Sequence, residues 1–253
     1  MKNTVFVVGC NGKMGRILCD LIDESDDFFM VAGYDMQSRP GKTALSSIVQ
    51  HEEEDLDFFA CNVIIDFSKP DATLTVLNEA VKYKIPMVIA TTGFSPEQQE
   101  QIKEASKSIP IFQSSNMGLS TKRFIEVIKF AAKIFAEPYE ISIHEIHHSR
   151  KADAPSGTAK MLFDAVNEGR GNNLIYRFDS NGKKATNEVW VSASRVGNIC
   201  GTHIVTIANT NDSIELKHKI DNRDVFAEGA LDAARYLLKQ TEPGLYTMDD
   251  LMK

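Results

Sequence analysis

The amino-acid sequence predicts an α/β fold in which an N-terminal, doubly wound parallel sheet is followed by a second, mixed α+β domain. Two observations carry this prediction. Short β-rich runs alternate with helical segments up to about residue 117, as parallel βαβ units require. From residue 118 onward, helical segments give way to β-rich runs separated by short polar turns, which is typical of antiparallel strands.

In the N-terminal part, the strands and helices follow one another at regular intervals. Strands are expected at residues 4–8, 28–34, 63–67, 87–91 and 111–113, and helices at 14–22, 70–83 and 95–108. The third helix has a favourable start, because Ser95 can cap it, Pro96 fits its first turn and Glu97 lies at its positive end.

The C-terminal part has a different order of elements. It is expected to contain an amphipathic helix after residue 118, a strand, a loop and helix at 152–167, and antiparallel β-rich runs at 188–194, 202–208 and 213–220. A final helix at 225–239 is predicted to return and cover the first sheet. We therefore predict two domains, residues 1–117 together with 226–253, and residues 118–225.

The composition excludes several classes of protein. Of 253 residues, 43% are hydrophobic and 25% charged, as in ordinary globular proteins, and no run of 18 apolar residues occurs. A cytoplasmic protein with no membrane partner is therefore expected. The net charge of −7 also argues against nucleic acid, which requires a basic surface. The cysteines Cys10, Cys19, Cys61 and Cys200 are scattered, so we expect reduced thiols, no disulfide and no metal site.

A glycine-rich loop follows the first expected strand. Gly9, Gly12 and Gly15 stand between that strand and the first helix, where glycine lets backbone N–H groups approach a pyrophosphate closely. Asp35 follows the next β-rich run, at the spacing of an acid that binds a ribose. The pattern predicts a Rossmann-type dinucleotide site, although the glycines alone could serve a tight turn and Asp35 alone could be a solvated acid.

The residue at this acidic position also bears on the choice of dinucleotide. The carboxylate of Asp35 accepts hydrogen bonds from a 2′-hydroxyl but repels a 2′-phosphate, and the next residue, Met36, is uncharged. NADH is therefore favoured over NADPH. Arg39 and Lys42 are close enough in sequence to bind a phosphate, which leaves NADPH open.

Residues 144–160 combine basic side chains with a helix start. His147, His148, Arg150 and Lys151 form a cationic group at the end of an expected strand. In an acidic protein, such a group suits a small anion with more than one carboxylate.

The same segment continues into a helix at Ser156, Gly157 and Thr158. The N–H groups at the start of a helix attract a carboxylate. An equally simple interpretation is that Ser156 or Thr158 only caps the helix and that the charged groups form a solvated loop.

Four motifs in this order resemble those of the 4-hydroxy-tetrahydrodipicolinate reductase family. They are Gly-x-x-Gly-x-Met-Gly-Arg from Gly9, Ala-Thr-Thr-Gly-Phe from Ala90, Ser-Asn-Met from Ser115, and Glu-x-His-His-x-x-Lys-x-Asp-Ala-Pro-Ser-Gly-Thr-Ala from Glu145. The resemblance covers nearly the whole chain. The long motif is highly specific, whereas the glycine loop is not.

The resemblance implies a function and an assembly. The implied reaction is the NAD(P)H-dependent reduction of 4-hydroxy-tetrahydrodipicolinate to tetrahydrodipicolinate, in the diaminopimelate route of lysine biosynthesis. A Rossmann domain would bind the dinucleotide, and a mixed α+β domain would bind the dicarboxylate substrate and form a homotetramer.

The resemblance to this family also implies roles for individual residues. His147 would be the proton donor, with Lys151 as its catalytic partner, while His148, Gly157 and Thr158 would bind substrate carboxylates. The implied dinucleotide site consists of Gly9, Cys10, Asn11, Gly12, Lys13, Met14, Asp35, Ala90, Thr91, Thr92, Ser114, Ser115, Asn116 and Met117.

Some positions depart from the family or lack a role. The family commonly has arginine where this chain has Met36, which puts NADPH use in doubt. Arg195 and His203 lie in segments that resemble the family, but we derive no chemical role for them, and Arg223 is hypothesised to reach the cofactor. Two other functions stay open: another two-domain dehydrogenase of an amino-acid precursor such as a semialdehyde, and a non-catalytic dinucleotide sensor.

Overall fold

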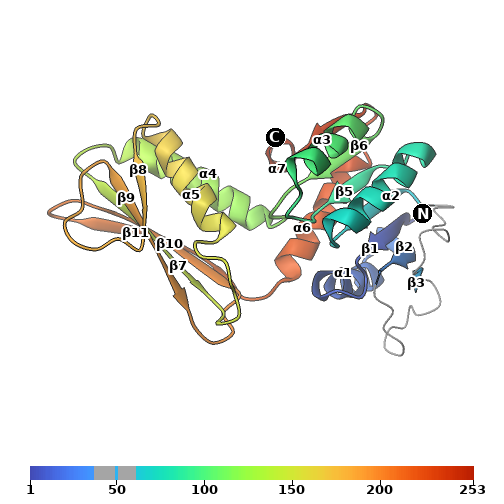
Figure 1. The fold of residues 1–253 in the computed structure, drawn as a ribbon, viewed down its shortest axis with the longest axis horizontal. Helices are drawn as coiled ribbons and strands as arrows, with labels where there is room; N and C mark the ends of the chain where they lie inside the picture. Colours follow the sequence, from blue (N-terminus) through green and yellow to red (C-terminus); the bar gives the residue numbers. More distant parts are fainter. Residues whose placement is uncertain (37–48, 51–60) are drawn as a thin grey trace. The chain divides into compact units, whose positions relative to one another are not determined.

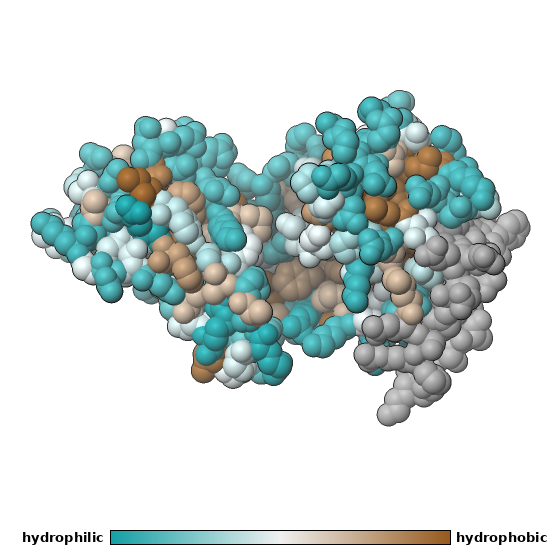
Figure 2. Space-filling model, viewed as in Figure 1, coloured by the Kyte–Doolittle hydropathy of each residue, from teal (hydrophilic) through white to brown (hydrophobic). Residues whose placement is uncertain are grey.

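The computed structural model describes residues 1–36, 49–50 and 61–253. The chain divides into two compact units (Figure 1). The first unit consists of Met1–Gly118 and Asp224–Lys253, and the second of Leu119–Arg223. Hydrophilic side chains cover much of the face shown in Figure 2, with smaller apolar areas between them.

The first unit contains a parallel sheet. Its strands are β1 (Asn3–Val8), β2 (Phe28–Tyr34), β3 (Val49–Gln50), β4 (Val63–Asp66), β5 (Met87–Ile89), β6 (Pro110–Gln113) and β12 (Gly244–Tyr246). They lie in the order β12-β6-β5-β4-β1-β2-β3, and every neighbouring pair is parallel. The predicted parallel sheet is therefore confirmed. The order reverses at β1, and at such a switch point the carboxyl ends of the strands form a ligand crevice.

Helices pack against this sheet as a doubly wound fold requires. They are α1 (Lys13–Glu24), α2 (Pro70–Tyr83), α3 (Pro96–Ala105), α6 (Asp224–Leu237) and the short α7 (Met248–Leu251). α2 contacts α3, while α6 contacts α1 and the strands β4, β5 and β6. The prediction that the last long helix returns to cover the first sheet is confirmed.

Local sequence explains several of these elements. The side chains from Val5 to Val8 are fully buried, because a parallel sheet with helices on both faces needs strands that are apolar on both sides. The predicted start of α3 is confirmed, since Ser95 caps it in a capping box with Gln98 and Pro96 is its first residue.

The second unit contains a mixed sheet and two helices. Its elements are α4 (Leu119–Ile134), β7 (Glu140–His147), α5 (Gly157–Gly169), β8 (Ile175–Phe178), β9 (Glu188–Arg195), β10 (Gly201–Ala208) and β11 (Ser213–Ile220). The strand order is β11-β10-β7-β9-β8. α4 and α5 contact one another and share one hydrophobic core with the sheet (Figure 1).

The pairing of the three predicted β-rich runs follows their order in the sequence only in part. β10 and β11 are antiparallel neighbours as expected, but β9 does not pair with β10. β7 lies between them, antiparallel to β10 and parallel to β9. The crossover through α5 brings the chain back in the direction of β7, so β9 pairs parallel to β7 and β8 pairs parallel to β9.

No helix among the described residues is long and apolar enough to cross a membrane. Near the C-terminal end of the chain, β12 pairs with β6 and extends the first sheet beyond it.

Candidate active site

The glycine loop lies between β1 and α1 and is tightly packed. Gly9 has φ +77°, a conformation that glycine adopts readily. A Cβ added there would lie 2.5 Å from the carbonyl oxygen of Phe67, and one added at Gly15 would lie 2.0 Å from the carbonyl oxygen of Gly9. Gly12 is the N-cap of α1. The loop therefore brings backbone N–H groups and the positive end of a helix to the sheet edge, as a pyrophosphate requires.

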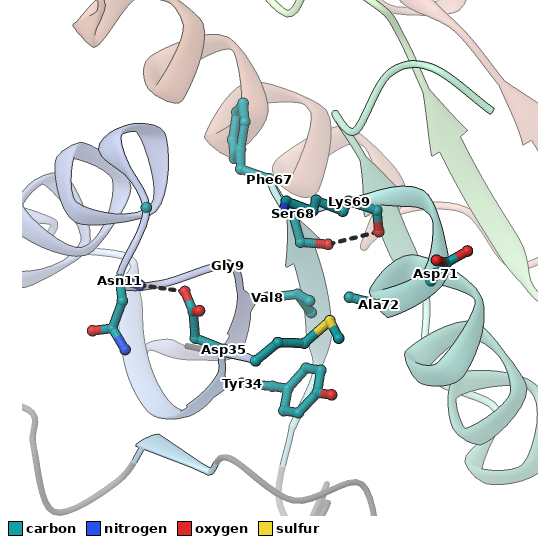
Figure 3. Close-up of a pocket in the computed structure, with 12 residues that line it drawn as sticks. Val8, Gly9, Asn11, Tyr34, Asp35, Phe67, Ser68, Lys69, Asp71 and Ala72 are labelled. Carbon is teal, nitrogen blue, oxygen red and sulfur yellow. Dashed lines mark hydrogen bonds between the residues drawn. The ribbon is translucent and has the colours of Figure 1, made fainter. Parts of the chain in front are cut away.

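This loop forms one wall of a cavity of about 600 Å³ (Figure 3). The cavity is lined by Val8, Gly9, Asn11, Gly12, Tyr34, Asp35, Met36, Phe67, Ser68, Lys69, Asp71 and Ala72. Asn11 and Asp35 lie on one side, and Ser68, Lys69 and Asp71 on the other. The backbone N–H of Asn11 donates to Asp35 Oδ2 over 2.9 Å. Asp35 thus anchors the loop and also faces the cavity, where a ribose hydroxyl would need an acceptor.

The remaining predicted loop residues are Cys10, Lys13 and Met14. Lys13 and Met14 begin α1. The thiol of Cys10 is buried in the core, and burial raises its pKa to about 12. Arg39 and Lys42 lie outside the described residues.

A buried acid that the sequence analysis missed organises the opposite wall. Asp66 ends β4 and accepts hydrogen bonds from the backbone and hydroxyl of Ser68 and from Thr73 Oγ1. Burial raises the pKa of Asp66, while these hydrogen bonds oppose the change. Thr91 Oγ1 accepts a second hydrogen bond from the Ser68 N–H, over 2.9 Å. Asp66 therefore shapes the turn that carries Lys69. An acid directly after a buried apolar run was the available signal.

The other predicted dinucleotide residues follow β5 and β6, at the same edge of the sheet as the glycine loop. Ala90, Thr91 and Thr92 follow β5, and Ala90 donates its N–H to the carbonyl oxygen of Asp66. Residues 114–117 follow β6 and form a turn. In it, Ser114 Oγ donates to the carbonyl oxygen of Asn116, the amide oxygen of Asn116 accepts from Gly118 N–H, Ser115 is exposed and Met117 is buried. These two turns are not among the described residues that line the cavity of Figure 3.

In the second unit, the register of the sheet assembles a polar cluster. Along β7, Ile141 and Ile143 face the core, and the period of two places Glu145 and His147 on the same face. β10 places His203 opposite Glu145, and β9 places Arg195 opposite His147. The inward face of the sheet therefore changes from apolar to ionisable at the end of β7.

Glu145 is the centre of this cluster and is fully buried. Its Oε1 accepts from Ser156 N–H over 3.0 Å and from Arg195 Nη2 over 2.9 Å. Its Oε2 lies 3.6 Å from His147 Nδ1 and 3.6 Å from His203 Nε2. Burial raises the pKa of Glu145, but its hydrogen bonds more than offset this and hold the pKa well below its usual range.

His147 is 8% exposed and is neutral near pH 7. Its pKa is lowered to about 4, chiefly by burial and in addition by the charges of His203, Lys151 and Arg195, while the charge of Glu145 opposes the change. A buried histidine at the end of a strand, beside cations, is suited to hold or give up a proton when the charge around it changes.

Lys151, His148 and Arg223 are further basic side chains of this unit. Lys151 Nζ is held by both carboxylate oxygens of Asp153, at 2.7 and 2.8 Å, and this ion pair lowers the pKa of Asp153. Arg223 Nη2 lies 3.5 Å from His148 Nε2. The structure therefore brings Arg223, for which the sequence analysis hypothesised contact with a cofactor, to a predicted substrate-binding histidine.

The start of α5 completes the site. Ser156 is the N-cap and its Oγ accepts from Ala159 N–H over 3.1 Å, so the capping interpretation of Ser156 is correct. Gly157 and Thr158 follow as the first two residues of the helix. The N–H groups at these positions point out of the end of a helix, which suits a carboxylate.

From the sequence, Arg195 and His203 had no predicted role, and Glu145 was only part of a motif. One signal was available: alternating apolar residues along 141–147 predict that Glu145 and His147 share the buried face.

Glu145, His147 and His203 each have one atom within 4.8 Å of the others, as metal ligands would. Arg195 already places a positive charge on Glu145, which disfavours a divalent cation there.

The fold and the site define the class: a two-unit oxidoreductase with a Rossmann-type nucleotide-binding sheet. Family models for the N-terminus and the C-terminus of dihydrodipicolinate reductase match residues 3–117 and 121–252. The chain belongs to the dihydrodipicolinate reductase family.

Similar proteins span the whole chain. The 4-hydroxy-tetrahydrodipicolinate reductase of Caldanaerobacter subterraneus is 42% identical, covering 100% of this chain and 99% of that protein. The Clostridium tetani enzyme of the same name is 36% identical, covering 98% of this chain and 96% of its own. The dipicolinate-bound dihydrodipicolinate reductase from Paenisporosarcina sp. TG-14 has the same fold, with a TM-score of 0.77, 20% identity and 98% coverage of both chains.

Proposed function

We propose that this protein reduces 4-hydroxy-tetrahydrodipicolinate to tetrahydrodipicolinate with NAD(P)H, in the diaminopimelate route of lysine biosynthesis. One structural observation carries the proposal: the end of β7 joins a buried histidine, His147, to several cations and to the N-terminus of α5. Membership of the family over the whole chain supports it. A semialdehyde dehydrogenase or a dinucleotide sensor would leave this second cluster without a purpose.

The first unit is the proposed cofactor site. The glycine loop would hold the pyrophosphate, Asp35 the adenosine ribose, and the turns at 90–92 and 114–117 the remainder of the dinucleotide. The bound nicotinamide would supply the hydride. We propose that NADH is favoured, because Asp35 faces the cavity and the exposed Met36 beside it carries no charge to bind a 2′-phosphate.

The second unit is the proposed substrate site. The Paenisporosarcina relative binds dipicolinate, which is a dicarboxylate. In this chain, His148 would bind one carboxylate and the N–H groups of Gly157 and Thr158 another. The Lys151 ammonium, held by Asp153, would offset the negative charge of the substrate.

His147 would donate the proton that the reduced ring requires at carbon. In the free protein its pKa of about 4 leaves it neutral. A dianionic substrate next to the ring raises that pKa, so His147 would take up a proton as the substrate binds. Its Nδ1 faces Glu145, which leaves Nε2 as the atom that transfers the proton.

We also propose a homotetramer, assembled through the face of the second sheet that α4 and α5 do not cover. Ile146, Trp190 and Ile204 lie on this face and are partly exposed. Light scattering coupled to size exclusion would give four times the 28.1 kDa chain mass if the proposal is right.

We place the activity in the cytoplasm, where the four free thiols would stay reduced.

The decisive experiment follows the absorbance of NADH, and separately of NADPH, after adding the protein to freshly generated 4-hydroxy-tetrahydrodipicolinate. We expect rapid oxidation by the wild type, faster with NADH, and a loss of about 10² to 10⁴ in kcat for His147→Gln because the general acid is gone. His144→Gln is the matched control: His144 lies on the same strand, but its ring is hydrogen-bonded to Ser192 on the opposite face.

Two outcomes would contradict the proposal. If neither nucleotide is oxidised, the reaction is wrong. If His147→Gln retains more than about a tenth of the wild-type kcat, His147 is not the acid.

A further inference from the structure

We propose that Glu145 is the positioning residue of the site: it orients His147 through Nδ1 and at the same time fixes the start of α5, so that the acid and the carboxylate-binding N–H groups are held in one arrangement. This inference rests on the proposed function for its catalytic consequence. Its structural part is testable without any substrate.

The first argument is the pair of buried atoms that face one another. Glu145 Oε2 and His147 Nδ1 are both buried, and neither has a hydrogen-bond partner within the described part of the chain. They lie 3.6 Å apart, just beyond hydrogen-bonding distance. Leaving two buried polar atoms unpaired is costly, and catalytic hydrogen bonds often tighten only when the ligand binds. A small movement of the ring would pair them.

The second argument concerns the histidine tautomer. A hydrogen bond from Nδ1–H to the Glu145 carboxylate places the transferable proton of His147 on Nε2. On that side the chain has Gly201, where an added Cβ would lie 3.2 Å from His147 Nε2. The missing side chain keeps space beside Nε2 open.

The third argument is the other oxygen of the same carboxylate. Oε1 accepts from the backbone N–H of Ser156, the residue directly before Gly157 and Thr158. Arg195 Nη2 donates to the same oxygen and also to the carbonyl oxygen of Asp153. One carboxylate therefore connects β7, β9 and the start of α5.

The charged groups around His147 predict the direction in which its pKa changes when Glu145 is replaced. The groups that act on it are Glu145 on β7, Arg195 on β9, His203 on β10 and Lys151 in the loop after β7. Of these four, Glu145 alone raises the pKa of His147, and the other three lower it. Removing the charge of Glu145 should therefore lower the pKa of His147 still further.

The first test is an NMR titration of protein labelled with ¹³C at histidine Cε1, with and without dipicolinate as a dicarboxylate probe. The His147 signal is assigned by its loss in His147→Gln. We expect Glu145→Gln to lower the His147 pKa by at least about one pH unit, in the free and the dipicolinate-bound protein. Glu140→Gln is the matched control, because Glu140 begins the same strand and is paired with Lys184 outside the cluster.

The kinetic arm uses the same variants. Glu145→Gln is expected to lower kcat by about 10²-fold. The acidic limb of the pH profile of kcat should move to lower pH, as the His147 pKa does in the NMR titration. The dissociation constant for NADH should not change. Glu140→Gln should behave as the wild type in both arms. An unchanged His147 pKa in a folded Glu145→Gln protein would overturn the inference, whatever the activity.

A second variant keeps the inference testable if Glu145→Gln does not fold. Gly201→Ala leaves the Glu145 contacts in place and puts a methyl group beside His147 Nε2. We expect at least a tenfold fall in kcat with the His147 pKa within about 0.5 of the wild-type value. Full activity of Gly201→Ala would show that Nε2 is not the atom that meets the substrate. If the wild type oxidises neither nucleotide, the proposed function fails while the NMR result for Glu145 still stands.

Discussion

The ionisation of His147 links the folding of the second unit to its proposed chemistry. Its pKa of about 4 is lowered from the ordinary value of 6.5, chiefly by burial. Between these two values the unfolded chain binds a proton that the folded chain does not. The stability contributed by neutral His147 is therefore complete above about pH 6.5 and is lost as the pH falls toward 4.

This relation predicts a pH dependence of stability. The free energy of unfolding should fall by about 2 kcal/mol between pH 7 and pH 5 through His147 alone. Urea denaturation at both pH values measures it, and His147→Gln, which cannot bind the proton, should show a smaller change. Equal pH dependence in the two proteins would mean that His147 is not buried as described.

Among single residues, the position of Asp35 could be predicted from the sequence, whereas the role of His203 could not. The position of Asp35 after the second strand was sufficient to expect an acid beside the glycine loop, and it lies there, bonded to Asn11. His203 offered no such signal, because its partner, Glu145, is 58 positions away and the two meet only through strand pairing.

At the scale of elements, the contact between the glycine loop and α1 depends on Gly15. A Cβ at this position would lie 2.0 Å from the carbonyl oxygen of Gly9 and 2.7 Å from Cys10 Cα, and backbone atoms cannot move away cheaply. The close approach of α1 to the glycine loop therefore requires a residue without a side chain at this position.

We therefore expect Gly15→Ala to displace α1, to weaken NADH binding by tenfold or more and to destabilise the protein by about 2 kcal/mol. Fluorescence titration with NADH and thermal unfolding measure the two effects. Gly157→Ala is the control, since a Cβ there meets nothing within 4 Å. NADH binding as tight in Gly15→Ala as in the wild type would contradict the close-packing argument.

The order of the strands also belongs to this scale. Periodicity located β9 and β10 within a residue or two, but it could not show that β7 lies between them. β7 occupies the central position because both of its neighbours complete the core face formed by Ile141 and Ile143.

At the scale of the whole molecule, the two units differ in how the chain builds them. The second unit is one continuous segment, Leu119–Arg223, with its own hydrophobic core. The first needs both ends of the chain, because α6 supplies buried side chains to it and Arg235 on α6 forms an ion pair with Asp27.

Residues 119–223 expressed alone should therefore unfold cooperatively in urea, followed by circular dichroism. Residues 1–118 alone should not, since they lack the apolar face of α6, whose buried leucines contribute about 1.5–3 kcal/mol each. Fusing 224–253 to residue 118 through a flexible linker should restore a cooperative transition. Cooperative unfolding of 1–118 without this segment would show that α6 is dispensable.

The sequence by itself determined the alternation of strands and helices, the glycine loop with its acid, the two-part organisation and the family, because these depend on local periodicity and on motifs a few residues long. Only the tertiary structure decided that Glu145 joins His147, His203, Arg195 and Ser156, and that Asp66 shapes a wall of the cavity beside the glycine loop. Those contacts depend on strand register and burial, and both are set by packing between segments that lie far apart in the chain.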